Sequence, residues 1–217
     1  MRNSARITFR KFGDLRFIGH RDLVRLFERM LRRTGVELAL SQGFHPKAKL
    51  SFPLALAVGI EGAQELLEVQ FSQVVDSENL EQLLREHCPS GIDILDVVLL
   101  DDGTPKAQPL AIEYRVPIPA DRWVIAEEAI RQFMQSDSSP ICREGRAVPI
   151  DARADIEALE ISEGELRMVL RITRSASAAP REILQLLELE TLESQGASLV
   201  RSAIRWNFDD VMTTSLP

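Results

Sequence analysis

The chain has few of the residues that build metal sites and covalent crosslinks. Its 217 residues include two cysteines, Cys88 and Cys142, and three histidines. The cysteines lie far apart in the sequence, and neither they nor the histidines have the spacing of a zinc or iron–sulfur ligand set. Two isolated thiols are typical of a protein in a reducing compartment, where they stay free and buried. We therefore predict no metal site and no bound cofactor.

Long apolar segments and common catalytic motifs are also missing. No run approaches the roughly 20 apolar residues that a membrane span needs. The first residues, MRNSARI, have no apolar signal core, so we expect a cytoplasmic protein with no membrane contact. The sequence also has no glycine-rich phosphate loop before a helix and no nucleophile elbow.

The charge is distributed unevenly along the chain. Residues 1–50 contain twelve Lys and Arg and four Asp and Glu, a formal charge of +8. Since the whole chain carries −7, the remaining residues carry −15. The first segment is therefore expected to attract polyanions, whereas the acidic remainder repels them and suits a basic partner.

Residues 20–33 have the spacing of an amphipathic helix. At 100° per residue the apolar side chains fall within one arc of about 160°, and Gly35 follows as a stop. Arg21, Arg25, Arg29 and Arg32 fall within about 80° on the opposite side. Such a stripe is either a solvated face, in which Glu28 pairs with Arg32, or a phosphate-binding face. Arginine suits the second role because its planar guanidinium meets phosphate oxygens with two hydrogen bonds.

A turn with the sequence Gly43-Phe44-His45-Pro46 follows this helix. Residues 47–52 alternate as a strand, which places Lys47 and Lys49 on one face. Phe44 either packs into the core or offers a stacking surface to a nucleobase. His45 is a loop hydrogen-bonding group, a ligand contact or an acid–base group.

The pattern of the whole chain predicts an α+β protein. Elements up to residue 100 follow the order β-α-β-β-α-β, and elements after residue 110 repeat that order without repeating the residues. We therefore predict two tandem ferredoxin-like (βαββαβ) halves with antiparallel sheets. The predicted boundaries are an N-terminal half at 1–101, a linker at 102–109, a C-terminal half at 110–208 and a tail at 209–217.

Several segments resemble a known family. In the first half these are FGDLRFIGHRDLVRLFERMLRRTG and LALSQGFHPKAKLSFPLALAVGIEGAQELLEV, and in the second half VPIDARADIEALEI, LRMVLRI and APREILQLLEL. They are similar to the radical SAM-linked family, a domain of unknown function also called DUF2344. The resemblance implies a partner, since members are encoded beside or fused behind a radical SAM protein. It implies no reaction, and two distant cysteines do not form the cluster site of a radical SAM enzyme.

Three hypotheses follow for the function. The first is a non-catalytic accessory module that binds RNA or presents a substrate to a radical SAM enzyme. The second is an adaptor whose basic face docks on the radical SAM partner without nucleic acid. The third is a metal-free endoribonuclease with His20 and His45 as acid and base; otherwise we predict no catalytic residue. The residues predicted to contact RNA or another anion are Arg16, Arg21, Arg25, Arg29, Arg32, Gln42, Phe44, His45, Lys47 and Lys49.

Overall fold

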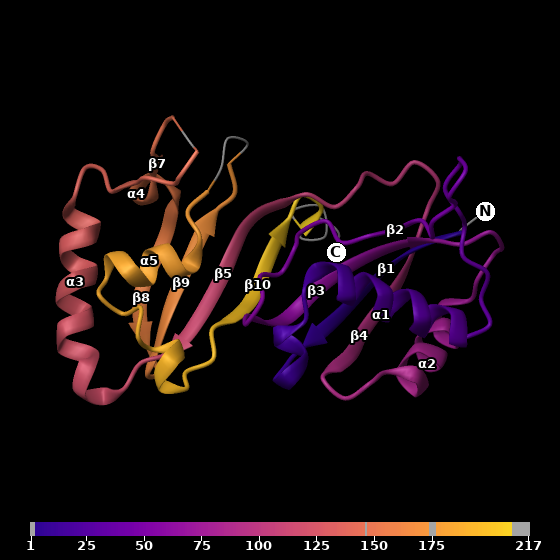
Figure 1. Ribbon diagram of the computed structural model, residues 1–217, viewed down its shortest axis with the longest axis horizontal. Helices are drawn as coiled ribbons and strands as arrows, with labels where there is room; N and C mark the ends of the chain where they lie inside the picture. The colour runs from indigo at the N-terminus through magenta and orange to yellow at the C-terminus, as the bar shows by residue number, and fades with distance from the viewer. Residues whose placement is uncertain (1–2, 146, 174–176, 210–217) are drawn as a thin grey trace, which may run out of the picture. The chain divides into compact units, whose positions relative to one another are not determined.

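The computed structural model describes residues 3–145, 147–173 and 177–209. The chain divides into two compact units, residues 1–108 and 109–217 (Figure 1). Both units combine helices with antiparallel strands, and five α-helices occur within the described ranges. The expectation of an α+β protein is therefore confirmed.

The first unit is built on four antiparallel strands. They lie in the order β4-β1-β3-β2, which is fourth, first, third and second along the chain. In this sheet Ile7 of the central strand lies opposite both Leu67 and Val97. The elements are β1 (Ser4–Lys11), the 3-10 helix η1 (Gly13–Phe17), α1 (His20–Arg33), β2 (Leu50–Ser51), β3 (Glu61–Gln70), α2 (Ser77–His87) and β4 (Ile92–Leu100).

The predicted helix at residues 20–33 is confirmed as α1 and covers the core of the first unit. Its buried side chains are Leu23, Phe27, Met30 and Leu31. They form one cluster with apolar residues of α2, β1, β3 and β4. The Phe27 ring centroid lies 4.6 Å from that of Phe9. Because this stripe is packed against the sheet, the arginines on the opposite side of α1 face solvent.

The connection from α1 to β2 is less regular than the alternating pattern predicts. The expected strand at 47–52 is reduced to β2, Leu50–Ser51. Residues 36–41 pair through the isolated bridges Leu38–Phe71 and Leu40–Ala48. Pro46 has no backbone N–H to give to a ladder, so regular pairing begins after the turn.

Residues that follow β4 fold back onto the first unit. The Arg6 guanidinium pairs with Glu68 at 2.8 Å and donates through Nη2 to the carbonyl of Pro105 at 2.5 Å. Glu68 also accepts a hydrogen bond from the backbone N–H of Ala107 at 3.1 Å. These contacts hold the segment before residue 109 to the sheet.

The second unit has a main sheet in the order β10-β5-β9-β8, again antiparallel, with β6 and β7 as a separate pair. Glu163 and Gly164 form the turn between β8 and β9, both with positive φ. The elements are β5 (Pro109–Pro117), η2 (Ala120–Arg122), α3 (Trp123–Gln135), β6 (Pro140–Ile141), β7 (Ile150–Asp151), α4 (Ala152–Asp155), β8 (Ile156–Ser162), β9 (Glu165–Arg171), α5 (Pro180–Leu186), η3 (Glu193–Gln195) and β10 (Val200–Trp206). The predicted tail lies outside the described residues from residue 210 onward.

Candidate functional site

The outer side of α1 carries a row of exposed arginines, Arg21, Arg25, Arg29 and Arg32, which we call the arginine face. Their spacing places them on one side of the helix, opposite the buried stripe. Arg25, Arg29 and Arg32 line a shallow hollow of about 320 Å³ together with Asp22 and Glu28. All four arginines of the predicted stripe are exposed, and three of them line this hollow.

Few carboxylates neutralise this face. Arg25 approaches Asp22 at 3.7 Å, and both side chains are mostly exposed. Arg21, Arg29 and Arg32 have no ion pair or hydrogen bond with any residue that the structure describes. The Glu28–Arg32 pair that the spacing permits does not form. The charge of the face is thus left for solvent or for a ligand.

Arginines of the second unit behave differently. Seven of them form an ion pair with a glutamate: Arg115, Arg131, Arg143, Arg167, Arg171, Arg181 and Arg205. Glu113, for example, lies 2.7 Å from the Arg167 guanidinium. Arginine alone therefore does not identify a binding face; three of the four arginines of the arginine face lack, among the described residues, the carboxylate partner that these seven have.

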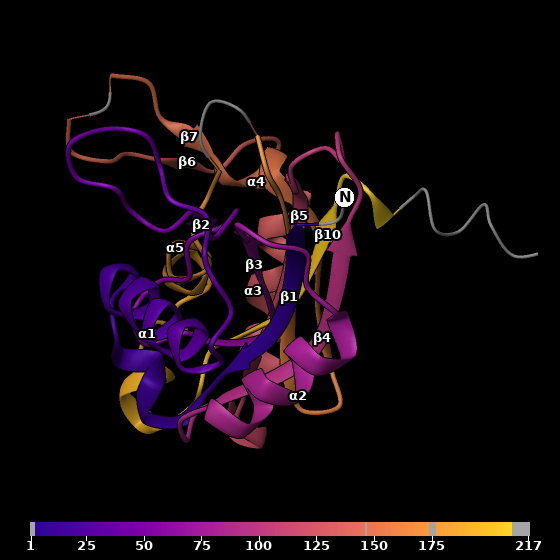
Figure 2. The same cartoon turned by 90° about the vertical axis from the view of Figure 1, so that its right-hand side faces the viewer.

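The loop at residues 41–47 forms a second basic element. It is closed by the Ser41 N–H, which donates to the Lys47 carbonyl at 2.8 Å, and by the Lys47 N–H, which donates to Ser41 Oγ at 3.0 Å. Phe44 at its tip is 102% exposed, so its alternative role as a core residue is wrong. Gln42, His45, Lys47 and Lys49 are exposed as well. Figures 1 and 2 show the loop on the α1 side of the first unit, above the helix.

The predicted binding residues do not all converge in one hollow. Lys49 lines a groove at β2 and β3 with Asp101 and Asp102, apart from the arginine face. Arg16 pairs with Glu61 at 3.3 Å and lies 4.6 Å over the Phe17 ring, so part of its charge is compensated. Among the described residues, the arginine face and the residues of the loop and of β2 therefore line no common hollow.

The two histidines proposed as acid and base are held in different settings. His20, at the first residue of α1, has its ring 5.6 Å from the Phe52 ring. His45 is exposed in the loop. No hydrogen bond or ring contact between the two occurs among the described residues.

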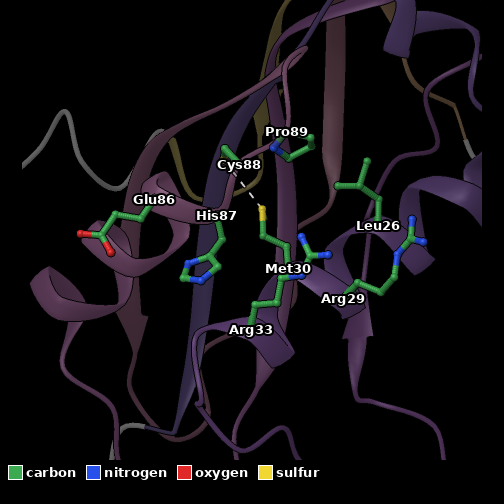
Figure 3. Close-up of a pocket in the computed structure, with 8 residues that line it drawn as sticks. All are labelled: Leu26, Arg29, Met30, Arg33, Glu86, His87, Cys88 and Pro89. Carbon is green, nitrogen blue, oxygen red and sulfur yellow. Dashed lines mark hydrogen bonds between the residues drawn. The ribbon is translucent and has the colours of Figure 1, made fainter.

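A further hollow, the interhelical groove, contains residues that the sequence prediction missed. It encloses about 490 Å³ between α1 and the end of α2 (Figure 3). From α1 it is lined by Leu26, Arg29, Met30 and Arg33. From α2 and the residues after it come Glu86, His87, Cys88 and Pro89. One feature of the sequence could have indicated this groove: Arg33 lies one helical turn after Arg29, at the edge of the arginine stripe.

The two sulfur atoms in the groove wall, those of Cys88 and Met30, are uncharged. Cys88 donates from Sγ to Met30 Sδ at 3.7 Å. Burial raises the pKa of the Cys88 thiol, which keeps it protonated near neutral pH. His87 Nδ1 lies 2.7 Å from the Leu83 carbonyl, and because a carbonyl only accepts, Nδ1 carries the proton.

The described residues show neither a metal-binding cluster nor a membrane-spanning helix. They contain no group of three or more His, Cys, Asp or Glu side chains arranged to hold a metal ion. Within the same ranges, none of the helices combines the length and the apolar character that crossing a membrane requires.

Comparison with known proteins identifies a family and little else. A family model described as an uncharacterized protein conserved in bacteria (DUF2344) matches residues 5–185. No curated protein matches the chain. A crystal structure of an unknown protein from Galdieria sulphuraria is similar over 94% of this chain and 98% of that one, at 11% identity and a TM-score of 0.30. That likeness is too weak to carry an argument.

Proposed function

Because this chain belongs to the DUF2344 family of uncharacterized bacterial proteins, we propose its function from its own surface: the first unit binds RNA and does not itself catalyse a reaction. The observation that carries this proposal is the arginine face, where Arg21, Arg29 and Arg32 have no partner among the described residues. Guanidinium groups in this state retain their full charge for phosphate oxygens. Contacts of this kind supply most of the affinity of a protein for a nucleic acid backbone.

The exposed loop supports the same function. The Phe44 ring is fully exposed at the tip of the loop, so both of its faces are available to another molecule. A nucleobase is a suitable partner because any base can stack on an aromatic ring. Lys47, which is exposed in the same loop, adds a charge for a phosphate. Phosphate contacts by α1 and base stacking by the loop are therefore complementary.

We further propose that the chain is an RNA-binding or substrate-presenting accessory of a radical SAM enzyme in the cytoplasm. The sequence resemblance supports the partner. The acidic remainder of the chain, with a formal charge of −15 beyond residue 50, suits docking to a basic surface.

We also propose that each unit is ferredoxin-like. The support is the strand order of the two sheets, which along the chain is fourth, first, third, second in each unit once β6 and β7 are set aside. Helices α1 and α2 of the first unit lie at the positions that this fold gives its two helices. Single-stranded RNA is bound by several folds built on such sheets, but fold analogy alone does not carry the function.

The test is to crosslink RNA to the purified protein with ultraviolet light, and to measure binding of a fluorescent single-stranded RNA over a range of salt concentrations. We expect crosslinked RNA, and an affinity that falls steeply as salt rises. Changing Arg21, Arg25 and Arg32 together to glutamine is expected to abolish both signals. The matched control is Arg131→Gln in α3, an exposed arginine that pairs with Glu128.

Other outcomes separate the alternatives. Recovery of no RNA, or binding that is independent of salt, rules the proposal out. A radical SAM partner that is retained after nuclease treatment and lost with Arg25→Glu and Arg29→Glu identifies the adaptor role. Cleavage of the RNA that is lost with His45→Ala identifies the endoribonuclease.

A further inference from the structure

The interhelical groove is lined by two arginines, Arg29 and Arg33, as well as by the sulfur-containing side chains of Met30 and Cys88. Arg29 and Arg33 lie four residues apart on α1, a rise of about 6 Å along the helix. Neither has an ion pair with any residue in the described ranges. Glu86 also lines the groove, but its carboxylate is directed away from both guanidinium groups (Figure 3). The groove therefore offers two guanidinium groups that form no ion pair with its one carboxylate, that of Glu86.

We propose that this groove binds a phosphate monoester, with Arg29 and Arg33 as its two donors. A monoester carries close to two negative charges at neutral pH and three terminal oxygens, which two planar guanidinium groups can share. A carboxylate has fewer oxygens and a single charge, and one arginine satisfies it. Leu26, Met30 and Pro89 form an apolar wall on which the body of the ligand packs.

The groove is continuous with the arginine face. Arg29 lines both the outer hollow, with Arg25 and Arg32, and the groove, with Arg33. A nucleic acid strand that follows α1 toward its C-terminal end therefore stays next to positively charged side chains until it reaches the groove. This step rests on the proposed function, because it assumes that the arginine face binds a strand.

The strand does not continue beyond the groove, because α2 is acidic there. Glu78, Glu81 and Glu86 line a hollow on the outer side of α2, and its Arg85 already pairs with Glu81 at 2.6 Å. A phosphate backbone is repelled by that surface. The charge pattern thus favours the end of a strand in the groove, where a terminal phosphate is a monoester. A free mononucleotide presents the same group, so both sources fit the chemistry.

The experiment compares RNAs of one sequence that carry a 5′-phosphate, a 3′-phosphate or hydroxyl groups at both ends, and adds adenosine monophosphate as a competitor. We expect one phosphorylated RNA to bind about three- to tenfold more tightly than the hydroxyl RNA. Arg33→Gln is expected to remove this preference, so that the phosphorylated RNAs bind no more tightly than the hydroxyl RNA. Arg32→Gln, the matched control one residue earlier, is expected to weaken all three RNAs equally and preserve the ratio.

The outcomes distinguish this inference from the function on which it rests. Equal binding of the three RNAs, or a preference that survives Arg33→Gln, overturns the groove as a phosphate monoester site while RNA binding stands. Binding of the mononucleotide that requires Arg33, in a protein that binds no RNA, supports the groove and removes the RNA-binding proposal. Loss of both RNA and mononucleotide binding overturns both. Thermal melting of each variant is the check that the first unit remains folded.

Discussion

Arg143 and Glu182 form a two-point ion pair in the second unit. Arg143 Nε donates to Glu182 Oε1 at 2.7 Å, and Nη2 donates to Oε2 at 2.6 Å. Glu182 Oε2 also accepts the N–H of Ala179 at 2.7 Å, at the start of α5. The Arg143 hydrogen bond holds the pKa of Glu182 below its usual value. This pair anchors α5 to the segment between β6 and β7.

Replacing Arg143 with glutamine is expected to lower the free energy of unfolding by about 1 kcal/mol at pH 7, allowing for partial solvent screening. The pKa of Glu182 is lower in the folded protein than in the unfolded chain. The pair therefore contributes its full stabilisation above the unfolded pKa of about 4.3, and this contribution is lost as the pH falls through the lower pKa of the folded protein. Urea unfolding at pH 7 and at acid pH measures both effects. The variant is expected to lose less stability on acidification than the parent. Arg131→Gln is the control for an exposed pair, and an equal effect of the two changes refutes the anchoring role.

The salt dependence of RNA binding is expected to change with single arginines of α1. Arg21→Gln removes one phosphate contact, so the slope of log affinity against log salt falls by about 0.7 for single-stranded RNA. The affinity falls similarly for RNAs of different sequence, since phosphates carry no sequence information. Fluorescence anisotropy at several salt concentrations measures the slope. A slope unchanged from that of the parent places Arg21 outside the contact surface.

Phe44→Ala is expected to separate binding from stability. The Phe44 ring is fully exposed, so its removal leaves the free energy of unfolding nearly unchanged. Loss of one stacked base reduces the free energy of RNA binding by about 1–3 kcal/mol. Val74→Ala, another exposed apolar residue of the first unit, serves as the control and is expected to change neither quantity. A destabilised Phe44→Ala protein contradicts the full exposure of this ring.

Phe27→Ala is expected to show the opposite behaviour. Phe27 is 0% exposed and packs against Phe9 and Phe52, with ring centroids at 4.6 and 5.6 Å. Truncation of such a ring costs about 3–5 kcal/mol because it leaves a cavity. Chemical unfolding monitored by circular dichroism measures the loss. Phe17→Ala, in which the ring is 57% exposed, is the comparison and is expected to lose much less.

Local patterns predicted α1 well and the loop poorly. The helix from His20 to Arg33 follows from apolar residues at helical spacing and from Gly35, which adopts φ +74° after its end. The strand predicted at 47–52 was too long because alternation alone does not supply a partner strand. The core alternative for Phe44 was wrong because burial depends on what lies opposite a side chain, which the turn residues do not encode.

The sequence by itself determined the arginine stripe of α1 and the position of its buried side, because both depend on a helical period within fourteen residues. Only the tertiary structure decided which arginines remain without carboxylates, since Arg143 finds Glu182 thirty-nine residues away while Arg29 finds none among the described residues. It also brought Arg33 and Cys88 into the lining of one groove. Contacts between residues so far apart depend on strand order and helix packing, which short-range spacing does not specify.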